Sequence, residues 1–148
     1  MSHFRVTFRS VSLFTALAAL LLMRSGSVSA AASAWQLVDY QQATCVRLGN
    51  PYVPAPTTYY AIWINGTWTR PINGGASQLP AHSSFSTNYL PIAPGSSTGV
   101  YSLASVSVTV SPDTPVGIHT LGIWATDGTS MQSIPVTLRV TTTKCSRY

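Results

Sequence analysis

The feature that most constrains this chain is the segment Ser111–Val140, in which two runs of alternating apolar residues flank an Asp-Gly pair. Asp127-Gly128 is typical of a two-residue β-hairpin loop, which would place Leu121 opposite Ile134. Alternate residues then form one apolar face: His119, Leu121, Ile123, Ala125, Ile134, Val136, Leu138 and Val140. Because side chains alternate along a strand, this face is expected to be buried and Trp124 to lie outside the core.

A second turn signal is the pair Asn65-Gly66, between two β-rich runs in Tyr59–Ile72. Asn-Gly is the favoured pair for a type I′ hairpin turn, and a turn there would make Trp63 and Trp68 a close cross-strand pair. This register gathers two opposite faces, one with Tyr59, Trp63, Trp68 and Arg70, the other with Tyr60, Ile62, Ile64, Thr67 and Thr69. The pattern leaves open which of the two faces is buried.

The remaining strand-like runs are short and separated by turn residues, and glutamate, a good helix former, is absent. That composition is typical of an antiparallel β-sandwich or barrel. Further strands are expected at Trp35–Leu48, at Ala76–Leu79 and Ser84–Leu90 as short edge strands, and at Val100–Val110 with Val106, Val108 and Val110 inward. Prolines make Pro51–Pro56 an extended, exposed connection.

Residues 1–30 are expected to be an export signal and not part of the fold. Arg5 and Arg9 precede a short apolar run, which falls below the roughly 20 residues that a helix needs to span a bilayer. Val28-Ser29-Ala30 and Ala32-Ser33-Ala34 both fit a signal-peptidase site, so cleavage is expected near 30–34. The alternative is a retained membrane anchor. We therefore expect a secreted protein whose mature domain comprises residues 31–148, with no membrane span after cleavage.

Cys45 and Cys145 are the two cysteines of the chain. In an exported protein such a pair is expected to form a structural disulfide, and the alternative of two reactive thiols lacks a C-x-x-C spacing. The bond would join an early strand to the C-terminal tail. It would close a loop of roughly 100 residues, for which chain entropy predicts a stabilisation of up to about 4.7 kcal/mol.

The charge of the chain argues against a nucleic-acid partner. Three of its eight basic residues lie in the expected export signal, which leaves five basic and three acidic side chains and a net charge of +2. Binding to phosphates needs many clustered Lys and Arg. Five scattered cations do not make such a patch.

Side chains that commonly act in catalysis are also few. The expected mature domain has three acids, Asp39, Asp113 and Asp127, and two histidines, His82 and His119. The acids fall on different elements, which does not suit a carboxylate pair, and the chain has no G-x-S-x-G motif. A metal site needs more ligands than these. We expect no enzyme activity, no metal and no cofactor.

The segment TPVGIHTLGIWATDG, followed by SIPVTLRV, resembles the last strands of immunoglobulin-like bacterial extracellular domains. The matching residues are Pro115, Gly117, Ala125, Asp127, Gly128, Val136, Leu138 and Val140. The resemblance implies a single immunoglobulin-like β-sandwich. His119 stands where such domains usually have a corner tyrosine, so the resemblance implies that it hydrogen-bonds the backbone. The whole layout is similar to small secreted proteins of Gram-positive, actinobacterial type, and it transfers no activity.

Aromatic side chains are the remaining candidates for function. Trp63, Trp68, Tyr59 and Arg70 would form an exposed platform of the kind that marks a binding surface. The alternative is that Trp63 is the buried sheet tryptophan of an immunoglobulin-like core.

These observations predict a monomeric, secreted, non-catalytic module that binds an extracellular glycan or protein. One specific form is a carbohydrate- or cell-wall-binding module that uses the aromatic platform. The other is a small inhibitor or protein-interaction factor that acts through the proline-rich segments Asn50–Pro56 and Pro71–Pro94. Self-association through unprotected sheet edges is a third alternative.

Overall fold

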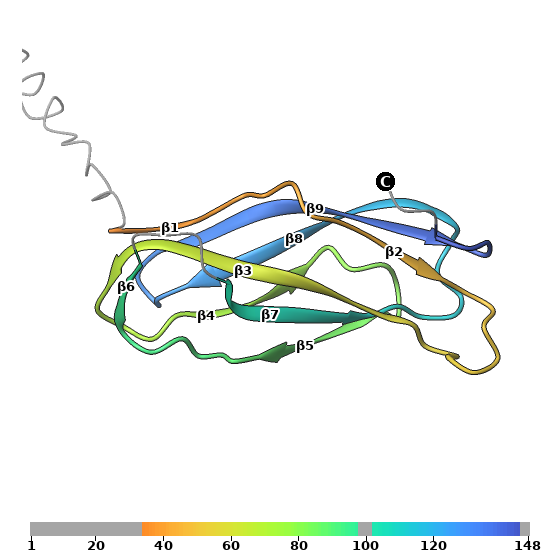
Figure 1. Ribbon diagram of the computed structural model, residues 1–148, viewed down its shortest axis with the longest axis horizontal. Helices are drawn as coiled ribbons and strands as arrows, with labels where there is room; N and C mark the ends of the chain where they lie inside the picture. Colours follow the sequence, from red (N-terminus) through yellow and green to blue (C-terminus); the bar gives the residue numbers. More distant parts are fainter. Residues whose placement is uncertain (1–33, 98–101, 146–148) are drawn as a thin grey trace, which may run out of the picture. The chain divides into compact units, whose positions relative to one another are not determined.

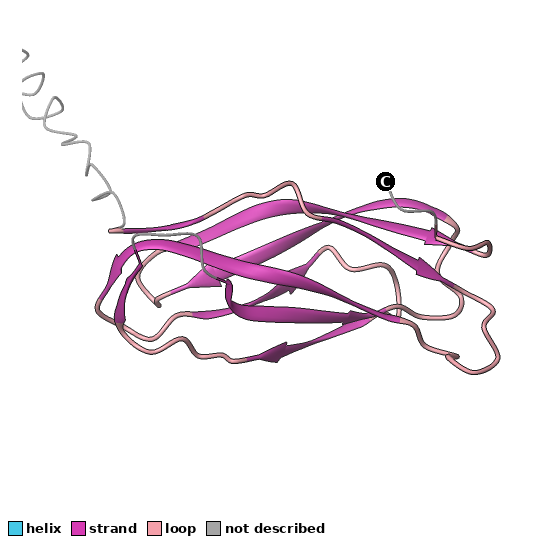
Figure 2. Ribbon diagram, in the orientation of Figure 1, coloured by secondary structure: helices cyan, strands magenta, loops and turns pink. Residues whose placement is uncertain are grey.

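The computed structural model describes residues 34–97 and 102–145, and the regular structure in these ranges is entirely β-strand (Figure 1, Figure 2). In chain order the strands are β1 (Trp35–Leu37), β2 (Ala43–Arg47), β3 (Thr57–Trp68), β4 (Asn73–Ser77), β5 (Ser84–Asn88), β6 (Gly95–Ser97), β7 (Ser102–Thr109), β8 (Gly117–Thr126) and β9 (Met131–Thr141). The expected all-β fold is confirmed. Within the described ranges, no helix is long and apolar enough to cross a membrane. The expected export signal, residues 1–30, lies outside the described residues.

The strands form two sheets on either side of one apolar core. One sheet has the order β1-β3-β7-β5, with β6 also pairing with β3, and the other has the order β2-β9-β8-β4. Among the described strands every pair is antiparallel except β2 with β9, which is parallel. The expectation of a purely antiparallel arrangement is therefore wrong at this pair, because the early strand β2 enters the second sheet alongside the last strand.

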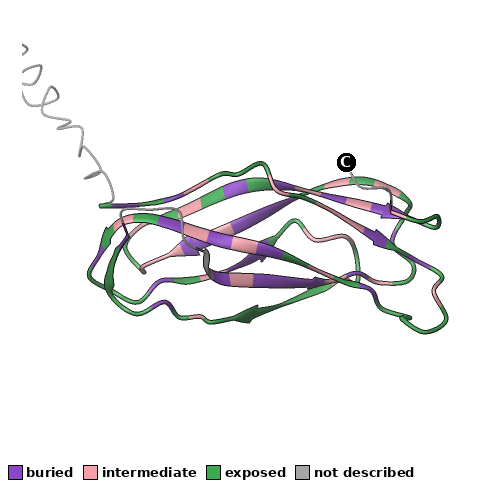
Figure 3. Cartoon of the chain, viewed as in Figure 1, coloured by how far each residue is buried: buried purple, intermediate pink, exposed green. Residues whose placement is uncertain are grey.

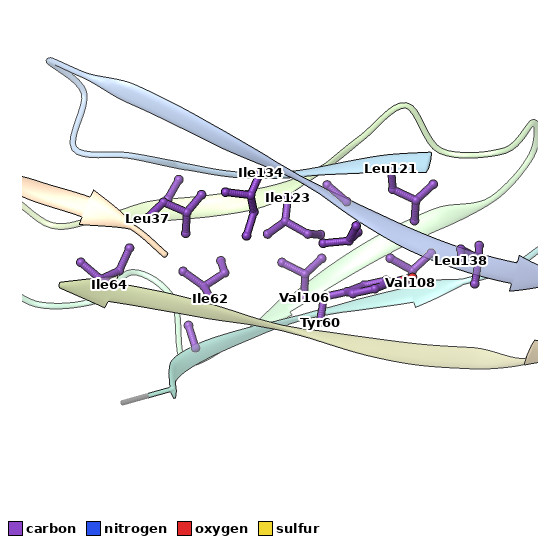
Figure 4. Packing of buried hydrophobic residues seen from close by; sticks show 14 of the residues in the cluster. Leu37, Tyr60, Ile62, Ile64, Val106, Val108, Leu121, Ile123, Ile134 and Leu138 are labelled. Carbon is purple, nitrogen blue, oxygen red and sulfur yellow. The ribbon is translucent and has the colours of Figure 1, made fainter. Parts of the chain in front are cut away.

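Alternation along the long strands positions the core (Figure 3, Figure 4). Side chains at every second position are fully buried, among them Tyr60, Ile62, Ile64, Val106, Val108, Val110, Leu121, Ile123 and Leu138. Burial of each such apolar side chain stabilises the fold by about 1.5–3 kcal/mol. The inward positions expected for Val106, Val108 and Val110 are confirmed.

The first expected strand, Trp35–Leu48, is divided between the two sheets. β1 pairs with β3, whereas β2 pairs with β9. The connecting residues 38–42 turn where the Gln41 backbone N–H donates to Asp39 Oδ1 at 2.6 Å and Gln41 adopts a positive φ of 50°. An Asx turn of this kind interrupts a strand without changing its apolar alternation, so periodicity did not reveal it.

The Asn65-Gly66 pair is not a turn, and the expected hairpin is wrong. β3 runs through it as one continuous strand, with Asn65 paired to Gln36 and Gly66 paired to both Trp35 and Ser97. Gly66 has a φ of 104°, and a Cβ built there would lie 2.3 Å from the carbonyl oxygen of Ala34. Because Gly66 has no Cβ, it allows the backbones of β1 and β3 to approach closely.

The β8–β9 hairpin is confirmed, but its loop has a different length. Thr126 pairs with Met131, so the loop contains the four residues 127–130, and Leu121 faces Val136 instead of Ile134. The register differs from the expected one by two residues. Because side chains alternate with period two, the buried face is the expected one. Trp124 lies outside it and is half-buried.

His119, on the same strand β8, makes the backbone hydrogen bond expected of it. Its Nε2 lies 2.9 Å from the carbonyl oxygen of Pro115. The side chain is half-buried, and this bond gives one ring nitrogen a hydrogen-bond partner near the start of β8.

Two long-range links connect the strands, one a disulfide and the other a pair of hydrogen bonds made by Tyr60. The disulfide Cys45–Cys145 is confirmed and joins β2 to the tail that follows β9. Tyr60, fully buried on β3, accepts from Thr44 Oγ1 at 2.7 Å and donates to the Thr137 carbonyl oxygen at 3.0 Å. Burial raises the pKa of this phenol, although the Thr44 hydrogen bond acts in the opposite direction. Tyr60 thereby joins β3 to both β2 and β9.

The proline-rich stretch between Pro71 and Pro94 contains two strands, β4 and β5. β4 and β5 lie at the edges of their sheets, as expected, although β4 begins and ends earlier than the range 76–79. Gly75 on β4 makes room for two rings, since a Cβ there would lie 2.7 Å from Phe85 and 2.8 Å from Trp124. The stretch is therefore built into the fold and is not a free loop.

Candidate functional site

The candidate site is the surface of the β1-β3-β7-β5 sheet that points away from the core, here called the outer face. Register and alternation assign the following side chains to it: Gln36, Tyr59, Ala61, Trp63, Asn65, Ser84, Ser86, Asn88, Ser105, Ser107 and Thr109. Tyr40, from the connection between β1 and β2, joins them through its contact with Trp63. The outer face therefore combines aromatic rings with hydroxyl and amide groups.

Three aromatic side chains of this surface, Tyr40, Trp63 and Tyr59, form what we call the aromatic strip. The rings of Tyr40 and Trp63 have centroids 5.1 Å apart and planes at 65°, which is an edge-to-face contact. Tyr40 is 42% exposed, Trp63 is half-buried, and Tyr59 is 61% exposed. Trp63 lies four positions after Tyr59 along the strand, or about 13 Å away. The strip therefore has an edge-to-face pair of rings at one end and the exposed ring of Tyr59 at the other.

Backbone and amide contacts on either side of Tyr40 hold the segment that carries this ring against β3. The Val38 N–H donates to the Trp63 carbonyl oxygen at 2.9 Å. On the other side of Tyr40, the Gln42 amide receives the Ala61 N–H at 2.7 Å and donates to the Ala61 carbonyl oxygen at 2.8 Å. These contacts also occupy backbone groups of β3 that the short β1 leaves unpaired.

The ladder between β3 and β7 shifts register between Ile62 and Trp63. Such a bulge bends a strand and re-aims the side chain beside it. The extra residue, Leu103, lies on β7 opposite the step from Ile62 to Trp63, the tryptophan of the aromatic strip.

No side chain that we assign to the outer face is charged at neutral pH. The acid closest in sequence is Asp39, and its Oδ1 accepts the Gln41 N–H. Aromatic rings, hydroxyls and amides suit a ligand with apolar C–H faces and many hydroxyl groups. A phosphate or carboxylate would find no cation there.

The structure separates the four residues expected to form one platform. Tyr59 and Trp63 share the outer face, but Trp68 is only 5% exposed on the core side, where its indole N–H donates to the Ala93 carbonyl oxygen at 2.7 Å. Arg70 lies beyond β3, and its guanidinium donates to Thr129 Oγ1 at 3.0 Å. Without a turn, the odd number of steps from Trp63 to Trp68 places them on opposite faces.

Sequence reasoning missed Tyr40 as a member of the site. No local signal marks it, because its contact with Trp63 depends on the path of residues 38–42 between the two sheets. The alternative in which Trp63 is a buried core tryptophan does not fit either, since Trp63 is half-buried. Among the described residues, the buried aromatic side chains are Trp35, Tyr60 and Trp68.

A second polar cluster lies where the turns before β5 and before β8 meet. His82 Nδ1 lies 2.9 Å from Asp113 Oδ2, Ser111 Oγ also donates to Asp113, and both contacts lower the pKa of this carboxyl, with Ser111 the larger cause. In the part of the chain that the structure describes, the His82 ring has no other hydrogen bond. Among the described residues, the cluster therefore shows no hydrogen bond between a serine hydroxyl and the His82 ring. Nor do three or more His, Cys, Asp or Glu side chains come together as a metal site within 34–97 and 102–145.

Asp127 joins the β8–β9 loop to β1. Its Oδ1 accepts the backbone N–H groups of Ser130 at 2.7 Å and Thr129 at 2.8 Å, and its Oδ2 accepts the Trp35 indole N–H at 2.8 Å. These bonds, with Ser130 the largest cause, lower the pKa of Asp127 from 3.8 to about 2. The role of this carboxylate is structural, because it fixes the loop and anchors a buried tryptophan.

We predict that Asp127→Asn destabilises the fold at pH 7 by about 1 kcal/mol. Because the folded-state pKa lies below 3.8, the ionised carboxylate stabilises the fold above about pH 4, and this contribution disappears as the pH falls toward 2. Urea titrations of wild type and variant at several pH values measure the difference, which should shrink on acidification. Asp39→Asn is the control for loss of an exposed charge. A difference that stays constant between pH 7 and pH 2 would contradict the role assigned to Asp127.

Comparison with known proteins identifies one matching family. The model of a family described as "Family of unknown function (DUF5980)" matches residues 36–142, a span that includes the whole aromatic strip and more than half of the chain. No curated protein and no solved structure matches the chain.

Proposed function

The chain belongs to this family of unknown function (DUF5980), and we propose that it is a secreted, non-catalytic module that binds an extracellular glycan on its aromatic strip. The observation that carries the proposal is the outer face, where Tyr40, Trp63 and Tyr59 lie among uncharged hydroxyl and amide groups. The negative π-face of an aromatic ring attracts the C–H groups on the face of a sugar ring, and neighbouring hydroxyls and amides can bond its hydroxyl groups.

The proposal of a secreted protein has two supports. One is the sequence of residues 1–30, which has the charge, apolar run and small residues of an export signal. The other is the disulfide Cys45–Cys145, since such bonds persist in oxidising compartments. Both agree with an extracellular ligand.

We further propose that the fold is an immunoglobulin-like sandwich. The chain leaves one sheet after β1 and enters the other as β2, parallel to the last strand. His119 bonds the Pro115 carbonyl oxygen near the start of the penultimate strand, where immunoglobulin-like domains have their corner tyrosine. In folds of this kind an exposed sheet face is a rigid platform on which a site can be built.

Trp63→Ala is predicted to weaken binding to a neutral polysaccharide at least about fivefold, by analogy with the stacking of a nucleic-acid base on one aromatic ring, which contributes roughly 1–3 kcal/mol. Retention of the purified protein on insoluble cellulose and chitin, and titration with their soluble oligosaccharides, provide the measurement. The matched control is Tyr52→Ala, which removes a 91% exposed aromatic ring from the β2–β3 loop. Equal retention of wild type and Trp63→Ala would refute the aromatic strip as a glycan site.

A second candidate function rests on the β2–β3 loop. Tyr52 protrudes from it, and the loop is pre-formed by two local bonds, from the Tyr52 N–H to Asn50 Oδ1 at 3.1 Å and from the Val53 N–H to the Asn50 carbonyl oxygen at 3.0 Å. A rigid, proline-rich loop with an exposed tyrosine is suited to insert into the cleft of another protein, as inhibitory loops do.

Exposure to a panel of secreted proteases tests this alternative. An inhibitory loop should remain uncut for hours and reduce protease activity, and Tyr52→Ala should abolish the effect while Trp63→Ala leaves it intact. Cleavage within Asn50–Pro56 in minutes would exclude an inhibitory role.

A further inference from the structure

Two exposed amides stand side by side at the end of the aromatic strip. Gln36 on β1 and Asn65 on β3 are direct cross-strand partners, and both side chains are exposed. Within the described residues neither side-chain amide makes a hydrogen bond. In contrast, the Gln42 amide is bound to Ala61, and the Gln132 amide to the backbone of Leu37 and Trp35.

The amide pair borders an open hollow next to the aromatic strip. The hollow has a volume of about 230 Å³, and it is lined by Ala34, Trp35, Gln36, Asn65 and Gly66. Asn65 lies two residues from Trp63 on the same face, or about 7 Å along the strand. A ligand that stacks on Trp63 can therefore reach both amides.

The hollow has a rigid wall. Gly66 is paired on one side to Trp35 of β1 and on the other to Ser97 of β6, and the Thr67 N–H donates to the Ala34 carbonyl oxygen at 2.9 Å. Trp35 is itself anchored through its indole to Asp127. Because these backbone groups are already ordered, a ligand would bind there without the entropic cost of ordering a loop.

We propose that Gln36 and Asn65 are the hydrogen-bonding subsite of the glycan site and make it selective for neutral sugars with adjacent hydroxyl groups. The inference rests on the proposed function. Each amide presents a carbonyl oxygen and an NH₂ group, so the pair can accept from and donate to two neighbouring hydroxyls. Directly opposed residues of an antiparallel pair have Cβ atoms about 5 Å apart, which brings both amides within reach of one sugar ring.

Charge explains the selection against acidic sugars. Arg70 donates to Thr129, and Arg47 and Arg139 lie on the β2-β9-β8-β4 sheet. The ionised group connected to the hollow by a direct bond is the carboxylate of Asp127, through Trp35. A sugar carboxylate placed there would lose hydration without gaining a charged partner among the residues that line the hollow.

Titration of the full domain with cellohexaose, chitohexaose and hexagalacturonate tests the subsite. Wild type is expected to bind one of the neutral oligosaccharides at least tenfold more tightly than the acidic one. Gln36→Ala and Asn65→Ala should each weaken neutral binding five- to twentyfold, and the double variant more. Asn73→Ala, which removes an exposed amide from β4 in the other sheet, is the matched control and should bind like wild type. Thermal melts of all variants should coincide with wild type.

The outcomes separate the two proposals. If Trp63→Ala loses binding while the Gln36→Ala/Asn65→Ala double variant keeps wild-type affinity, the subsite is wrong and the glycan site stands. Tighter binding of hexagalacturonate than of either neutral oligosaccharide would also overturn the subsite. If wild type binds none of the three probes, and Trp63→Ala also matches wild type on insoluble polysaccharide, both proposals fail.

Discussion

Replacing Cys45 and Cys145 together by alanine is expected to lower the free energy of unfolding by about 3–5 kcal/mol. The disulfide spans 100 residues, so its removal releases a large part of the unfolded chain from a constraint. The folded state is also affected, because β2 lies at the edge of its sheet and pairs only with β9 among the described strands. Urea unfolding at pH 7, followed by tryptophan fluorescence, gives the difference.

Two comparisons make this result specific to the disulfide. Wild type in excess reductant should show the same loss as the double alanine variant, since both lack the cross-link. Amide hydrogen exchange in the reduced protein should accelerate first in β2 and in the tail after β9, while β3 and β7 remain protected. A loss below about 1 kcal/mol would mean that the reduced chain keeps the same constraint by other contacts.

Gly66→Ala is expected to destabilise the fold by about 2–4 kcal/mol, although it adds a single methyl group. Two causes add together: the φ of 104° is unfavourable for alanine, and the new Cβ would lie 2.3 Å from the Ala34 carbonyl oxygen. The clash should detach β1 from β3 and expose Trp35. Urea titration measures the cost, and a red shift of tryptophan emission reports the exposure.

Gly128→Ala is the matched control for this prediction. Gly128 also has a positive φ, 82°, but no atom lies within 4 Å of a Cβ built there. Its substitution should therefore cost about 1 kcal/mol, from the backbone conformation alone. Equal costs at the two glycines would show that β1 does not approach β3 as closely as described, and would favour a turn at Asn65-Gly66 over a continuous strand.

The β8–β9 hairpin shows what periodicity can predict. The alternation of Leu121, Ile123 and Ala125 identified the buried face correctly, even though the loop has four residues and the register moved by two. A strand has a side-chain period of two, so any even shift preserves its faces. The loop length depended on the Asp127 carboxylate, which binds two backbone N–H groups and the side chain of Trp35 from β1. Long-range contacts of this kind have no signature within the loop.

The Asn65-Gly66 pair shows where local propensity fails. The dipeptide favours a turn, but a turn would leave the backbone of β3 without the partners that β1 and β6 supply. A continuous strand satisfies these groups and buries Ile62, Ile64 and Trp68 on one face. Burial of three large side chains contributes several kcal/mol, which exceeds the preference of one dipeptide.

The candidate site was predicted in part. Tyr59 and Trp63 were expected on one face and do share it, because both lie on one strand at even spacing. Trp68 and Arg70 were assigned to that face only through the hairpin and do not belong to it. Tyr40 and Gln36 come from a segment that joins β3 from elsewhere in the chain. Nothing in the hairpin region could have indicated them.

By itself the sequence determined the all-β class, the pairing of Cys45 with Cys145 and the inward faces of β7, β8 and β9, because these follow from composition, a single cysteine pair and the period of a strand. Tertiary structure alone decided the path of residues 38–42, the parallel pairing of β2 with β9 and the strand through Asn65-Gly66. Those choices depend on which distant backbone groups find hydrogen-bond partners, a property of the whole chain and not of any local pattern. The aromatic strip and the amide pair beside it are consequences of those choices.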